Sequence, residues 1–96
     1  MARVDTTQKQ VAMVSAVTEL LKVRKTMKDF ETNEAMKRIS PIFSSVRDSA
    51  SRALMVAAVS KAGSLIEKNR SLTDKEVINQ TVREFPNILA EINFED

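Results

Sequence analysis

Apolar side chains recur at helical spacing near the start of the chain. Met13, Val17, Leu20, Met27 and Phe30 are separated by three or four residues, or by their sum. This period is typical of one face of an amphipathic helix. Asp5, Thr6 and Thr7 are each suited to cap its N-terminus. We therefore expect a first helix over residues 5–30.

A proline divides the next apolar positions between two expected helices. A short second helix is expected from Thr32 or Asn33. Its apolar positions are Ala35, Met36 and Ile39. Pro41 has no amide hydrogen to donate, but it fits the first turn of a new helix, for which Ser40 would be the N-cap. This pattern predicts that the second helix stops at Ser40 and that a third helix runs over residues 41–69.

The expected third helix contains an apolar stretch with no polar interruption. It comprises Ala53, Leu54, Met55, Val56, Ala57, Ala58 and Val59. A helix that is apolar on all sides is normally buried, so we expect this helix at the centre of the fold. Gly63 also lies inside it, where Gly costs about 1 kcal/mol relative to Ala.

A capping box predicts the start of a fourth helix. Thr73 would be the N-cap and Glu76, three residues on, would bond back to it. Pro86 would end or kink this helix, leaving a short last helix over residues 86–92. The whole pattern predicts one all-α domain over residues 1–96, a small bundle of four to five helices around a long, largely buried third helix.

The composition agrees with helices and restricts the class of protein. One Gly and two Pro are too few for a turn-rich β fold. The net charge of +2 indicates neither a strongly basic nor a strongly acidic surface. The chain has no Cys and shows no apolar leader or run near the ~20 residues needed to span a bilayer. We therefore expect an intracellular, cytoplasmic protein with no membrane segment.

The residue types that are missing exclude most catalytic chemistry. The chain has no His, Cys, Tyr or Trp, which removes the commonest general base, the thiol nucleophile and the usual zinc ligands. A single Gly cannot build a phosphate-binding loop. Nearby carboxylates such as Glu31 and Glu34 fall at an expected helix start, where they complement the dipole. We expect no enzyme activity, no cofactor, no metal and no small-molecule substrate.

Basic side chains cluster at the end of the first expected helix and in the second. We call this set the basic patch: Lys22, Arg24, Lys25, Lys28, Lys37 and Arg38. Such a patch can contact the phosphates of a nucleic acid or an acidic protein surface. The alternative interpretation is that these side chains are simply solvated, since basic residues are also favoured near the C-terminus of a helix, where they complement its dipole. No aromatic residue is interleaved with it, which argues against the stacking of bases.

Two apolar surfaces are candidates for contacts between helices. The small-residue stripe of the third helix comprises Ala50, Ala53, Ala57 and Ser64. Small side chains let helices approach to about 8–10 Å, so the stripe predicts either a contact with another chain or a tight internal core. The C-terminal apolar contact comprises Phe85, Ile88, Leu89 and Phe94. It either docks on the bundle or stays open to a partner.

These features predict a non-catalytic helical interaction module. It would self-associate or bind a protein partner through contacts between helices. The alternative is a small nucleic-acid-binding accessory or regulatory protein that uses the basic patch.

Overall fold

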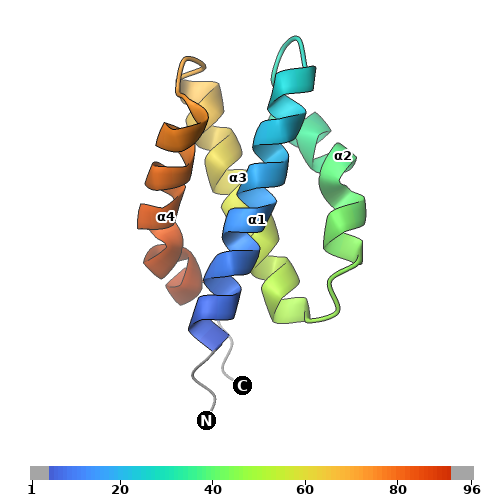
Figure 1. The fold of residues 1–96 in the computed structure, drawn as a ribbon, viewed down its shortest axis with the longest axis vertical. Helices are drawn as coiled ribbons and strands as arrows, with labels where there is room; N and C mark the ends of the chain where they lie inside the picture. Colours follow the sequence, from blue (N-terminus) through green and yellow to red (C-terminus); the bar gives the residue numbers. More distant parts are fainter. Residues whose placement is uncertain (1–4, 92–96) are drawn as a thin grey trace.

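The computed structural model describes the backbone of residues 5–91 and the side chains of residues 9–90. Four helices account for most of this part: α1 (Asp5–Thr26), α2 (Thr32–Ser44), α3 (Ser49–Lys68) and α4 (Asp74–Glu91). Successive helices run in opposite directions and short loops join them (Figure 1). The all-α architecture expected from the apolar pattern is confirmed.

The centre of the bundle is a pair of helices. α1 and α3 pack against each other, and each also packs against α2 and α4. α2 and α4 flank this pair on opposite sides, and in the described chain they do not touch (Figure 1). The third helix is therefore central, as expected, but it shares that place with α1.

Side chains of α1 and α3 form most of the core. The buried residues of α3 are Leu54, Met55, Ala58, Val59, Ala62, Gly63 and Ile66. Opposite them, the expected stripe of α1 is buried at Met13, Val17 and Leu20. Burial of one such large apolar side chain contributes about 1.5–3 kcal/mol. α1 ends at Thr26, earlier than the expected end at Phe30. The ring of Phe30 is nevertheless buried, so the apolar stripe continues into the loop that follows the helix.

The expected break at Ser40 is wrong. α2 continues through Pro41 to Ser44. Pro41 cannot donate to the Lys37 carbonyl one turn earlier, but the Ser40 hydroxyl donates to that carbonyl at 3.1 Å. A side-chain hydrogen bond thus replaces the missing backbone bond and lets the helix pass the proline.

The third helix consequently begins later than expected. α3 begins at Ser49, after a loop, with Asp48 as its N-cap. One Asp48 carboxylate oxygen accepts from the Ala50 amide at 3.3 Å, and the other accepts from the Ser51 hydroxyl at 2.7 Å. The first of these bonds satisfies a backbone donor that the helix N-terminus leaves unpaired.

The capping box at the start of α4 is present as predicted. The Thr73 amide donates to Glu76 Oε1 at 2.9 Å, and the Glu76 amide donates to Thr73 Oγ1 at 3.1 Å. Pro86 was expected to end or kink this helix, and the expected end is wrong, because α4 continues through Pro86 to Glu91. Phe85 and Ile88 on either side of the proline are buried, so packing holds the helix together there. Ile92 lies outside the described residues.

Candidate functional site

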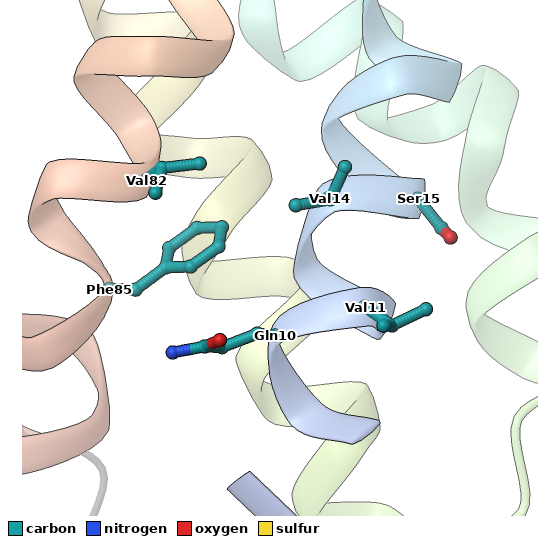
Figure 2. Close-up of a pocket in the computed structure, with 6 residues that line it drawn as sticks. All are labelled: Gln10, Val11, Val14, Ser15, Val82 and Phe85. Atoms are coloured by element: carbon teal, nitrogen blue, oxygen red, sulfur yellow. The ribbon is translucent and has the colours of Figure 1, made fainter. Parts of the chain in front are cut away.

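A groove of about 340 Å³ lies between α1 and α4 on the outer face of the bundle. We call it the α1–α4 groove. It is lined by Gln10, Val11, Val14, Ser15, Val82 and Phe85 (Figure 2). Val11 is 59% exposed and Val82 is 41% exposed. Within the described part of the chain these are the only exposed large hydrophobic residues, and both line this one groove.

Helical spacing places the lining residues on two strips, one on α1 and one on α4. On α1, Val11, Val14 and Ser15 are three and four residues apart, and thus share one face. On α4, Val82 and Phe85 are three residues apart. The Phe85 ring extends from α4 toward Val14 (Figure 2). Since the ring is itself buried, it forms the floor of the groove, and the exposed valines form its sides.

The same strip continues along α4 beyond the groove. Ile78 and Leu89 lie four residues before Val82 and four residues after Phe85. Both are half-buried and pack against the core. The apolar surface of α4 that faces the groove is therefore longer than the hollow itself.

The groove has no ionisable side chain among its lining residues. Its polar members are Gln10 and Ser15, which can donate or accept hydrogen bonds but do not titrate near neutral pH. It offers an apolar contact surface, and it offers no group for acid–base chemistry.

Several members of the basic patch are paired with carboxylates. Arg24 Nη2 lies 2.6 Å from Asp74 Oδ1, and Lys25 Nζ lies 3.3 Å from Asp74 Oδ2. The hydrogen bond from Arg24 is the main reason that the pKa of Asp74 is lowered. This cluster joins the end of α1 to the start of α4, so part of the patch has a structural contact.

The rest of the patch is spread over two helices. Lys22 Nζ lies 3.3 Å from Glu19 Oε2, and Arg38 Nε lies 3.8 Å from Glu34 Oε2. Lys28 and Lys37 are exposed and make no ion pair with a described residue. Carboxylates thus offset much of the positive charge that the sequence places here.

The small-residue stripe lies partly at the surface of α3. Ala50 and Ala57 are half-buried, whereas Ala53 and Ser64 are exposed. A shallow hollow at the start of α3 is lined by Ser49, Arg52, Ala53 and Val56. At Ala53 and Ser64 no helix of the described chain covers the stripe, so the internal-core interpretation fails there and the interface remains a prediction.

The C-terminal apolar contact is docked where the structure describes it. Phe85 and Ile88 are buried and Leu89 is half-buried. Phe94 lies outside the described residues. Phe85 thus belongs both to this predicted contact and to the groove.

Most of the groove was not predicted from the sequence. Phe85 was a candidate, but Gln10, Val11, Val14, Ser15 and Val82 were not. The available signal was a second apolar line on the first helix, since Val11 and Val14 lie outside the stripe that begins at Met13. Which of the two lines another helix covers depends on the packing.

Comparisons with models of protein families, with curated proteins and with solved structures found no match to this chain. No helix in the described residues has both the length and the apolar character needed to cross a membrane. In the same residues, no group of three or more His, Cys, Asp or Glu side chains is placed to hold a metal ion.

Proposed function

We propose that this protein is a non-catalytic interaction module that binds a helical surface of a protein partner in the α1–α4 groove. The observation that carries the proposal is the position of Val11 and Val82. They are the large apolar side chains that the described chain leaves in water, and they face one uncharged groove. An apolar channel between two antiparallel helices is a shape that accepts the apolar face of a third helix.

The expected strength of such a contact is modest. Covering the exposed parts of Val11 and Val82 contributes about 1 kcal/mol each, by scaling the value for a fully buried side chain. Association costs at least about 4 kcal/mol in lost freedom. The partner must therefore also cover the half-buried strip at Ile78 and Leu89 and make polar contacts at the edge of the groove.

The interaction module is favoured over nucleic-acid binding because the basic patch is largely paired. A surface that binds phosphates needs cations that can exchange their counterions for the nucleic acid. Here Arg24 and Lys25 already hold Asp74, and Lys22 and Arg38 each lie near a glutamate. The groove, by contrast, has exposed apolar surface with no partner in the described chain.

Site-specific photo-crosslinking tests this proposal. A benzoylphenylalanine in place of Val82 would be irradiated in an extract of the source cells, with the same residue in place of exposed Lys37 on α2 as the control. We expect protein adducts from position 82 that disappear when Val11→Lys is added, and no equivalent adducts from position 37. Identical adducts from both positions, or adducts that survive Val11→Lys, would contradict the proposal.

A further inference from the structure

We propose that the α1–α4 groove binds an amphipathic helix of another protein that is acidic at one end. This inference rests on the proposed function of the groove and specifies the chemistry of its partner. The acidic end of the bound helix would lie over three exposed lysines, Lys22, Lys25 and Lys75, which we call the lysine end of the groove.

The strip of α1 that lines the groove changes from apolar to basic along the helix. Val11, Val14, Thr18, Lys22 and Lys25 follow one another at spacings of three or four residues, so they lie along one face of α1. The two valines line the hollow. The two lysines lie near the end of the helix, and their side chains are 68% and 70% exposed.

The strip of α4 ends in the same way. Lys75, Ile78, Val82 and Leu89 are separated by three, four and seven residues, so they also share one face. α4 begins at the end of the bundle where α1 stops (Figure 1). The ion pair between Lys25 Nζ and the Asp74 carboxylate, at 3.3 Å, joins these two helix ends. The lysines of both strips are therefore at the same end of the groove.

Lys75 is the lysine whose position the helix itself does not explain. Cations are favoured at the C-terminus of a helix and disfavoured at its N-terminus. Lys25 suits the last turn of α1, whereas Lys75 is in the first turn of α4. The carboxylates beside Lys75 are engaged, Asp74 in two ion pairs with α1 and Glu76 in the capping box. The Lys75 ammonium group makes no ion pair with a described residue, so it can serve a partner.

The apolar hollow and the lysine end together specify the occupant. An apolar channel between helices accepts the apolar face of a third helix. Lysines at one end of the channel favour carboxylates there, because complementary potentials select a partner and fix its orientation. The hollow beside Val11 and Val82 has no charge to offer a phosphate, so a nucleic acid would use the lysines alone. An acidic amphipathic helix uses both.

The binding of two synthetic peptides to the purified full chain tests this inference. Each peptide is an amphipathic helix about 27 Å long, which is about 18 residues, with a leucine stripe and the same side-chain crosslink to hold it helical. The acidic peptide has glutamates near one end, and the basic peptide has lysines in their place. By fluorescence anisotropy, the acidic peptide should bind at least about tenfold more tightly in about 0.1 M salt. The difference should disappear near 1 M salt, where screening acts within about 3 Å.

Paired variants locate the binding site. Lys22→Glu with Lys75→Glu should weaken the acidic peptide at least about tenfold and strengthen the basic one, because the lysine end is reversed in charge. Lys37→Glu with Arg47→Glu changes the net charge equally at exposed positions outside the groove, so both affinities should stay the same. Val11→Asn removes apolar surface without adding charge and should weaken both peptides. All five side chains are exposed, so circular dichroism should stay helical.

Four results would overturn the inference. They are equal binding of the two peptides, no binding of either up to about 1 mM, and an equal effect of the two paired charge variants. The fourth is a single-stranded oligonucleotide that binds more tightly than the acidic peptide, loses affinity with Lys22→Glu and Lys75→Glu, and keeps it with Val11→Asn. That last result would identify the lysine end as a nucleic-acid site.

These outcomes are distinct from a failure of the proposed function. Adducts from position 82 that Val11→Lys abolishes, but that Lys22→Glu with Lys75→Glu leaves unchanged, would mean that the groove binds a protein through its apolar surface alone. The acidic partner is then wrong and the proposed function stands. If neither peptide binds and no such adduct forms, both proposals are wrong.

Discussion

Replacing Gly63 with Ala should destabilise the protein, although Ala is the better helix former. Gly63 is buried in α3, against the first turn of α2. A Cβ at this position would lie 2.5 Å from both Cγ2 and Oγ1 of Thr32, and 3.0 Å from its Cβ. Favourable contacts between carbon atoms are at about 3.5–4.0 Å. Thr32 cannot readily turn away, because its amide and hydroxyl both donate to Glu67 Oε2, at 2.8 and 2.7 Å.

The magnitude follows from two opposed effects. An Ala in place of Gly in a helix interior contributes about 1 kcal/mol of stability. Forcing an extra carbon into a packed contact costs about 1–3 kcal/mol. Since the overlap with Thr32 is severe, we expect the upper part of that range and a net loss of about 1–2 kcal/mol. For a domain of this size each kcal/mol lowers the melting temperature by about 4–8 °C.

Urea and thermal unfolding, followed by circular dichroism at 222 nm, would measure this loss. In a Thr32→Ala background the two atoms at 2.5 Å are gone, so Gly63→Ala should cost at least about 1 kcal/mol less there than in the natural chain. The matched control is Ala53→Gly at an exposed position of α3, which should cost about 1 kcal/mol from propensity alone. The reasoning is refuted if Gly63→Ala stabilises the natural chain, or if its cost is the same in both backgrounds.

Three further changes in stability can be measured by the same unfolding assays. Thr73→Ala removes the capping box of α4 and should cost about 1 kcal/mol; an unchanged urea midpoint would show that the box is not a stabilising contact. Pro86→Ala restores an amide donor inside α4 and should stabilise the protein by about 1–3 kcal/mol, and a loss of stability would mean that the proline itself is required. Hydrogen bonds lower the pKa values of Asp48 (mainly from Ser51), Glu67 (mainly from the Thr32 amide) and Asp74 (mainly from Arg24) below their ordinary values of 3.8, 4.5 and 3.8. Because the unfolded chain then takes up protons first, stability should fall as the pH drops from about 4.5 through the lowered pKa values, and a melting temperature that is flat below pH 4.5 would contradict this.

Local signals predicted the helix features that depend only on neighbouring residues. The capping box at Thr73 and Glu76 involves groups three residues apart, so it can be identified in the sequence and is present in the structure. The apolar period of α1 likewise needs no information from elsewhere in the chain. Asp48 as the N-cap of α3 was missed, because the third helix was expected to begin at Pro41, which assigned Asp48 to a helix interior.

The helix ends expected at Pro41 and Pro86 are absent, and the reasons lie in side-chain contacts that the backbone preference of proline does not include. A proline inside a helix removes one donor and strains one turn, which predicts a break. At Pro41 the Ser40 hydroxyl bonds the carbonyl that the proline leaves free. At Pro86 the neighbours Phe85 and Ile88 are buried against the core. Side-chain bonding in one case and tertiary burial in the other outweighed the local preference.

The sequence by itself determined that this chain is helical, where α4 begins and which stripe of α1 enters the core, because periodicity and capping act between residues a few positions apart. The tertiary structure decided that α1 shares the centre with α3, that Gly63 makes room for Thr32, and that Asp74 holds Arg24 and Lys25. It also decided that Val11 and Val82 face one groove. These features join residues far apart in the chain, so they exist only once the helices pack and leave one apolar face without a cover.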